Sequence, residues 1–114
     1  MAQRLASIAD AEAMLADSQR QPVLLFKHSS TCPVSFAARA EFDAFDALDS
    51  SPPCYVVVVQ TDRAVSAFLA DALDVRHESP QAVLIDAGTA VFAASHGRIR
   101  TATLAGAIRA HAAP

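Results

Sequence analysis

The fold of this chain is decided by the stretch Val23-Leu24-Leu25-Phe26-Lys27-His28-Ser29-Ser30-Thr31-Cys32-Pro33-Val34-Ser35. Its first four residues are all apolar, as in a strand that is buried in a sheet. A helical pattern begins near the end of this stretch, with Pro33 at the favoured first helical position. Cys32 therefore lies at the amino end of a helix, where free backbone N–H groups and the helix dipole favour a thiolate. The stretch predicts one reactive cysteine.

The segments around this stretch alternate between helix and strand. Residues 5–19 have apolar side chains at helical spacing, and Pro22 ends that pattern before the strand 23–27. Residues 33–48 suit a second helix, and residues 54–59 are apolar at every position, as in a strand with both faces buried. A single apolar stripe predicts a third helix after Thr61-Asp62.

The last third of the chain completes the pattern. Two short apolar runs, residues 82–85 and 90–94, surround Asp86-Ala87-Gly88 and predict a β-hairpin, and a last helix begins near Thr101. The expected order is α-β-α-β-α-β-β-α. Because a strand, helix, strand unit is right-handed and its sheet must be covered on both faces, this order predicts an α/β fold with a four-stranded mixed sheet between helices. That is the thioredoxin-like arrangement.

Composition limits the possible functions. The 114 residues are 53% hydrophobic and 18% charged, which predicts one folded domain over residues 1–114. The net charge of -3, without a cluster of Lys or Arg, argues against nucleic acid and anionic membranes as partners. No apolar run approaches the roughly 20 residues of a membrane-spanning helix. We expect a soluble cytoplasmic protein. In a reducing compartment its two cysteines, which form no Cys-x-x-Cys pair, are reactive or buried and not joined in a permanent disulfide, and too few ligands are present for a zinc site.

The residues next to Cys32 suggest how a thiolate would be held. If Cys32 is the N-cap, its sulfur can accept hydrogen bonds from the backbone N–H of Val34 or Ser35, and the Ser35 hydroxyl can donate to it as well. Thr31 and Pro33 flank the thiol, and we expect them to line the substrate site. Lys27 and His28 add positive charge there unless the end of the strand points them away.

Ser35 stands where a dithiol redox protein carries its second cysteine. A mixed disulfide on Cys32 must then be resolved by an outside thiol, so the sequence predicts monothiol chemistry. Cys54 is expected at the opposite end of the sheet, because a helix of roughly 16 residues is about 24 Å long and a disulfide needs Cα atoms within about 7 Å. We interpret Cys54 as a buried structural cysteine.

A second polar stretch, His77-Glu78-Ser79-Pro80, precedes the hairpin. A cis peptide costs little free energy before proline. On a thioredoxin-like sheet this loop faces the cysteine, where the Ser79 backbone could pair with an extended thiol substrate. His77 and Glu78 could bind the polar part of a small thiol. The alternative for Pro80 is an ordinary loop proline ahead of a strand, which the reactive cysteine makes the weaker interpretation. Solvated loop residues explain His77 and Glu78 nearly as well.

Two segments together resemble a known family. Residues 26–35, with Thr31-Cys32-Pro33-Val34-Ser35, and Val75-Arg76-His77-Glu78-Ser79-Pro80-Gln81 are similar to the YtxJ family of the bacillithiol system, the monothiol bacilliredoxins, whose centre is of the Thr-Cys-Pro-Ile-Ser type. The resemblance implies an oxidoreductase that removes bacillithiol from S-thiolated client proteins. It makes Cys32 the nucleophile and Pro80 the loop proline. It implies a low-molecular-weight thiol such as bacillithiol as co-substrate, and no other cofactor.

Two other functions stay open on the residues alone. A dimer of a monothiol glutaredoxin-like module could hold an iron-sulfur cluster through Cys32 of each copy, although the Cys-Gly-Phe-Ser centre of such proteins is missing. The chain could also be a redox-inactive thioredoxin-fold adaptor, in which Cys32 would react no faster than a model thiol.

Overall fold

The structure, a computed structural model, describes residues 2–112. Its elements in chain order are β1 (Gln3–Arg4), α1 (Ile8–Asp17), β2 (Val23–His28), α2 (Pro33–Asp46), β3 (Cys54–Val58), α3 (Arg63–Leu73), β4 (Gln81–Asp86), β5 (Thr89–Ser95), the 3-10 helix η1 (His96–Arg98) and α4 (Thr101–Ala112).

The strands form one mixed sheet with the order β1-β3-β2-β4-β5. β2 and β3 are parallel, whereas β4 is antiparallel to both β2 and β5. The predicted alternation of helices and strands and the mixed sheet are confirmed. The predicted number of four strands is wrong, because β1 adds a fifth strand beside β3. β1 has only two residues, both exposed, so it shows no apolar run that would reveal it in the sequence.

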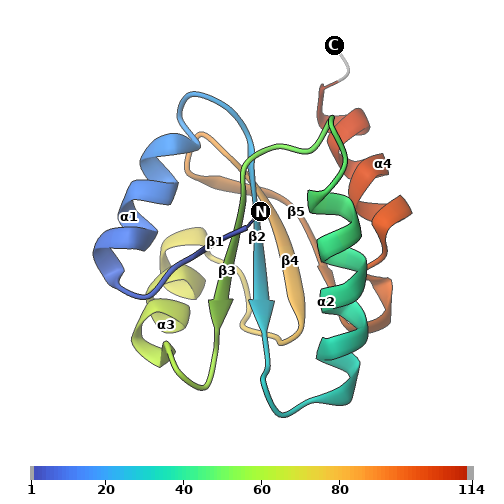
Figure 1. Ribbon diagram of the computed structural model, residues 1–114. Coiled ribbons are helices and arrows are strands. Elements are labelled where there is room, and N and C mark those ends of the chain that lie inside the picture. The colour runs from blue at the N-terminus through green and yellow to red at the C-terminus, as the bar shows by residue number, and fades with distance from the viewer. Residues whose placement is uncertain (1, 113–114) are drawn as a thin grey trace.

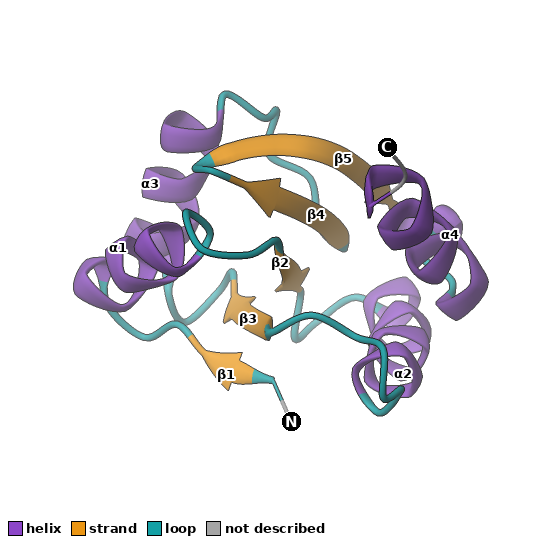
Figure 2. Cartoon of the chain, turned by 90° about the horizontal axis from the view of Figure 1, so that it is seen from above, coloured by secondary structure: helices purple, strands orange, loops and turns teal. Residues whose placement is uncertain are grey.

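Helices cover both faces of the sheet (Figures 1 and 2). α1 and α3 pack on one face, where Met14 and Leu69 meet Leu25 and Val83 in one core cluster. α2 and α4 pack on the other, where Phe42 belongs to the second cluster. All six residues of β2 are buried, as expected for a central strand with helices on both sides.

The strand directions decide where a site can form. Since β2 and β3 are parallel, their carboxyl ends lie at the same edge of the sheet, and β4 begins at that edge because it is antiparallel to β2. Lys27 near the end of β2 is the register partner of Gln81 at the start of β4. The connections from β2 to α2, from β3 to α3 and from α3 to β4 therefore meet at one end of the molecule (Figure 1).

Candidate functional site

Cys32 is the N-cap residue of α2, directly after the loop that leaves β2. Its backbone is extended, Pro33 occupies the first helical turn, and the side chain is partly exposed and not in a disulfide. The predicted position of the thiol at a strand-to-helix junction is confirmed. The thiol is thus accessible to a substrate at the positive end of a helix dipole.

The predicted contacts of the sulfur within the first turn are not formed. Cys32 makes no side-chain capping hydrogen bond, and the Ser35 backbone N–H donates to the Cys32 carbonyl oxygen at 3.0 Å. The Ser35 hydroxyl is also engaged elsewhere, since it accepts the Ser29 N–H at 2.8 Å and lies 2.9 Å from His28 Nδ1. Ser35 therefore ties the start of α2 to the end of β2 instead of holding the thiol.

His28 belongs to the α2 side of the sheet. Its ring stacks against Phe26 and meets Phe36 edge to face. Burial lowers the pKa of His28, the Arg39 charge lowers it further, and Asp43 opposes both effects. A neutral imidazole that accepts at Nδ1 takes the one proton that the Ser35 hydroxyl can donate. The expectation that His28 adds positive charge near the thiol is therefore not supported.

Lys27 points to the other face of the sheet, because side chains alternate along a strand. It is fully buried, and Nζ has no hydrogen-bond partner. Burial lowers its pKa, and its charge acts on His77, whose pKa is lowered first by burial and then by Lys27. Lys27 and His28 are neighbours in sequence, but their side chains lie on opposite faces of the sheet.

Gln60 organises the reactive loop, and the sequence reasoning missed it. Its Nε2 donates to Ser29 Oγ at 2.7 Å and to Thr31 Oγ1 at 3.1 Å, and its Oε1 accepts the Ser30 backbone N–H at 2.9 Å. The available signal was its place as the first polar residue after the apolar run 54–59. Since β2 and β3 are parallel, that position has to lie beside the loop after β2.

The loop before β4 comes to the same end of the sheet. The Ser79–Pro80 peptide is cis, as the sequence led us to expect, and the Pro80 carbonyl accepts the His96 N–H at 3.0 Å. The two polar side chains of this loop, His77 and Glu78, contact different elements. His77 Nδ1 lies 3.4 Å from Ser66 Oγ in α3, whereas the pKa of Glu78 is lowered first by a hydrogen bond with Ser95 of β5. Only His77 is placed beside α3.

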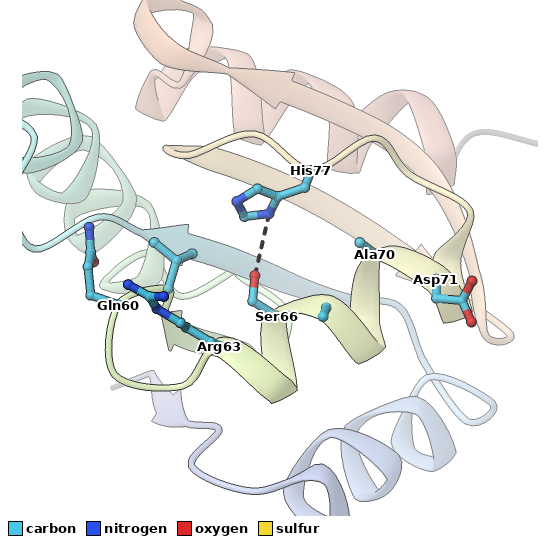
Figure 3. A pocket seen from close by; sticks show the side chains of 8 residues that line it. Gln60, Arg63, Ser66, Ala70, Asp71 and His77 are labelled. Atoms are coloured by element: carbon cyan, nitrogen blue, oxygen red, sulfur yellow. Dashed lines mark hydrogen bonds between the residues drawn. The ribbon is translucent and has the colours of Figure 1, made fainter.

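A cleft of about 730 Å³ opens between α3 and this loop (Figure 3). Polar side chains line it together with Val59, Ala67 and Ala70; the polar ones are Gln60, Arg63, Ser66, Asp71 and His77. Gln60 and Arg63 lie at one end of the cleft and Asp71 at the other (Figure 3). Because Gln60 also holds Thr31, the cleft adjoins the loop that carries Cys32.

The sequence matches the profile of the monothiol bacilliredoxin BrxC family over residues 3–104. The chain belongs to this family. A solved structure described as having a thioredoxin fold is 34% identical, with a TM-score of 0.85 over 94% of this chain and 93% of that one. The fold is thus that of thioredoxin, and fold and family together support a thiol redox role.

More distant thioredoxins share the fold alone. The thioredoxin of Fasciola hepatica is 17% identical with a TM-score of 0.77, over 96% of this chain and 98% of its own. That of Trypanosoma brucei brucei is 7% identical with a TM-score of 0.79, over 97% and 90% of the two chains. The thioredoxin arrangement therefore persists where almost no sequence is shared.

The second cysteine of this bacilliredoxin family member lies away from the site. Cys54 begins β3, so it is at the opposite end of the sheet from Cys32, and its Sγ donates to the Pro52 carbonyl at 3.3 Å. Burial, with Asp46 as the next cause, raises the pKa of the Cys54 thiol. A buried thiol held in its neutral form is a poor nucleophile. Both cysteines are free, as a monothiol mechanism requires.

Two structural features are absent from the described part of the chain. Within residues 2–112, no group of three or more His, Cys, Asp or Glu side chains is placed to hold a metal ion. No helix of that same part is long and apolar enough to cross a membrane.

Proposed function

We propose that this protein removes bacillithiol from mixed disulfides on client proteins, with Cys32 as the attacking thiolate. The observation that carries the proposal is an accessible Cys32 at the start of α2 with a serine, not a cysteine, three residues later, in a member of the monothiol bacilliredoxin family. Thr31, Pro33 and the Ser79-Pro80 peptide are the substrate-binding groups around it. Ser35 acts as a positioning residue through His28 and Ser29.

The chemistry is an exchange of sulfur bonds. The Cys32 thiolate attacks the bacillithiol sulfur of the client's mixed disulfide, a Cys32–bacillithiol bond forms, and the client sulfur leaves as a thiolate that takes up a proton. A second bacillithiol molecule, as its thiolate, then attacks the bacillithiol sulfur on Cys32. This step releases the Cys32 thiolate and one molecule of bacillithiol disulfide, so the two electrons come from the small thiol.

The surface around the thiol suits a protein substrate. Val34 and Phe36, in the first turn of α2, are 47% and 55% exposed. Exposed apolar side chains beside a reactive group are typical of a contact surface for another protein. The client would rest on these side chains while its mixed disulfide reaches Cys32.

The test is intact-mass spectrometry after mixing with a client that carries one bacillithiol. We expect wild type and Cys54→Ala to gain one bacillithiol as the client loses it, and Cys32→Ala to gain none. Uptake that requires Cys54, or none by any variant, would show that Cys32 is not a transferase nucleophile. A brown protein after anaerobic purification with iron would instead favour the iron-sulfur alternative.

A further inference from the structure

The only lysine of this chain is buried without a partner. Lys27 is fully buried, and among the described residues the buried side-chain atoms that lack a hydrogen bond are Lys27 Nζ and Gln81 Oε1. The two residues are register partners on β2 and β4, so they lie on the same face of the sheet. A buried ammonium group without an anion is unfavourable, so burial lowers the pKa of Lys27, and an anion nearby would favour its charged form again. The folded state becomes more stable if an anion comes close to Lys27 Nζ.

The cleft beside α3 is the place where an anion can approach Lys27. Lys27 lies on the sheet face that α3 covers, and its charge acts on His77 in the wall of the cleft. Arg63 is an exposed cation in that lining, whereas Lys27 is buried and is not itself a lining residue. Ser66, His77 and Gln60 add hydrogen-bonding groups to the lining. The lining carboxylate, Asp71, lies at the far end from Arg63 (Figure 3). The volume of about 730 Å³ suits a small organic molecule.

We infer that this cleft binds the carboxylate-bearing part of the small thiol while its sulfur is bonded to Cys32, with Arg63 and Lys27 as the groups that attract the carboxylate. Gln60 joins the two sites, because it lines the cleft and holds Ser30 and Thr31 next to Cys32. The inference rests on the proposed function. It adds that the protein selects its thiol by the negative charge of the carrier.

The kinetic test compares two mixed disulfides of one client protein. One carries bacillithiol, whose carrier bears carboxylates, and the other carries 2-mercaptoethanol, which is neutral. In Lys27→Met and Arg63→Ala, we expect kcat/KM to fall about tenfold more for the bacillithiol client than for the 2-mercaptoethanol client, as for the loss of one charge-assisted contact. Arg109→Ala is the matched control, since it removes an exposed arginine from α4 on the opposite face of the sheet.

Lys27→Met has a second signature that separates binding from structure. Methionine has a similar unbranched shape and no charge to bury, so the variant should resist urea better than wild type while it loses its preference for bacillithiol. A lysine with a structural role alone would show the opposite change in stability. Arg63→Ala keeps the comparison decisive if Lys27→Met does not fold.

A binding test avoids sulfur chemistry altogether. In Cys32→Ala labelled with ¹⁵N-lysine, the side-chain signal reports on Lys27 alone, because the chain has one lysine. Reduced bacillithiol should raise the pKa of Lys27 in this protein, and 2-mercaptoethanol should leave it unchanged.

The outcomes distinguish the two proposals. If wild type transfers bacillithiol but the variants keep its preference and the Lys27 signal does not respond, the cleft proposal is wrong. If the signal responds but wild type transfers no thiol, the binding site stands and the transferase function is wrong. If neither occurs, both are wrong.

Discussion

Ser35 shows how one residue sets the kind of redox chemistry. It lies in the first turn of α2, and its backbone N–H donates to the Cys32 carbonyl, so the two residues are close. Its hydroxyl is fully buried and is used by His28 and the Ser29 N–H. A mixed disulfide on Cys32 therefore meets no second thiol in the turn, and it persists until an outside thiol attacks.

Ser35→Cys should convert this monothiol centre into a dithiol one. The introduced thiol stands one helical turn from Cys32, within the reach of a disulfide. We expect intact-mass spectrometry to show an internal disulfide and free bacillithiol after one client turnover without added thiol, whereas wild type keeps its adduct. The loss of the hydroxyl should cost about 1–3 kcal/mol in the free energy of unfolding.

Ser35→Ala is the control for this change. It loses the same hydroxyl bonds to His28 and Ser29 but gains no thiol, so its bacillithiol adduct should persist as in wild type. An adduct that also persists in Ser35→Cys would show that position 35 cannot reach the sulfur bonded to Cys32.

Single residues show where prediction from the sequence ends. The placement of Cys32 depends on a local strand-to-helix transition, and the structure confirms it. The side chain of Ser35 could not be placed, because its partners depend on which way His28 turns at the end of β2. Gln60 was missed because it is about 30 positions from the loop that it holds, and only the parallel pairing of β2 and β3 brings them together.

At the scale of elements, the helices α2 and α4 are joined by hydrogen bonds between Glu41 and Thr101. Glu41 in α2 accepts the Thr101 backbone N–H at 2.8 Å, and the Thr101 hydroxyl donates to the Glu41 carbonyl at 3.0 Å. A carboxylate at the amino end of α4 satisfies an unpaired N–H and complements the helix dipole. The pKa of Glu41 is lowered, first by the hydrogen bond from the Thr101 backbone.

Glu41→Gln and Glu41→Ala should separate the charge from the hydrogen bond. We expect the Tm at pH 7 to fall in the order wild type, Glu41→Gln, Glu41→Ala, with a total loss of roughly 3–5 °C. Because the folded pKa is lowered, the contribution of the charge is present above the unfolded pKa of about 4.3 and is lost as the pH falls through the folded pKa. Differential scanning calorimetry at pH 7 and pH 3 checks this.

Two results would contradict a stabilising charge on Glu41. If Glu41→Gln matches wild type at pH 7, the charge contributes nothing. If the difference between these two proteins is as large at pH 3 as at pH 7, protonation of Glu41 is not its source.

Elements with an apolar pattern were predictable, and the exception is informative. The fully apolar run of β3 and the stripe of α3 result from burial, which the sequence records directly. β1 is held instead by backbone bonds, such as that from the Leu5 N–H to the Val56 carbonyl at 2.8 Å, and by the ion pair of Arg4 with Asp62. Backbone pairing leaves no trace in side-chain polarity.

For the whole molecule, the buried ionisable groups on the two faces of the sheet favour neutral forms. Burial lowers the pKa of Lys27 on the α3 side and of His28 on the α2 side. Burial raises the pKa of Tyr55 to about 12, with its hydrogen bond to Asp17 as the next cause. The folded state thus resists charging of its interior, which is the usual result of tight packing between a sheet and helices on both of its faces.

The effect of acid pH on the free energy of unfolding can be measured through His28. Its pKa is lowered in the folded state, so below the unfolded value of about 6.5 the unfolded chain binds more protons and stability falls with falling pH until the folded pKa is reached. Full titration of one such group changes the free energy of unfolding by at most about 1.4 kcal/mol per pH unit.

His28→Gln keeps a polar partner for Ser35 but cannot titrate. Urea unfolding between pH 7.5 and 5 should therefore give a shallower loss of stability in His28→Gln than in wild type. His111→Gln alters the pair between His111 of α4 and Asp86 of β4 and leaves His28 in place, so it should keep the loss of stability that His28 causes. Parallel curves for wild type and His28→Gln would mean that His28 is protonated as easily in the folded protein as in the unfolded chain.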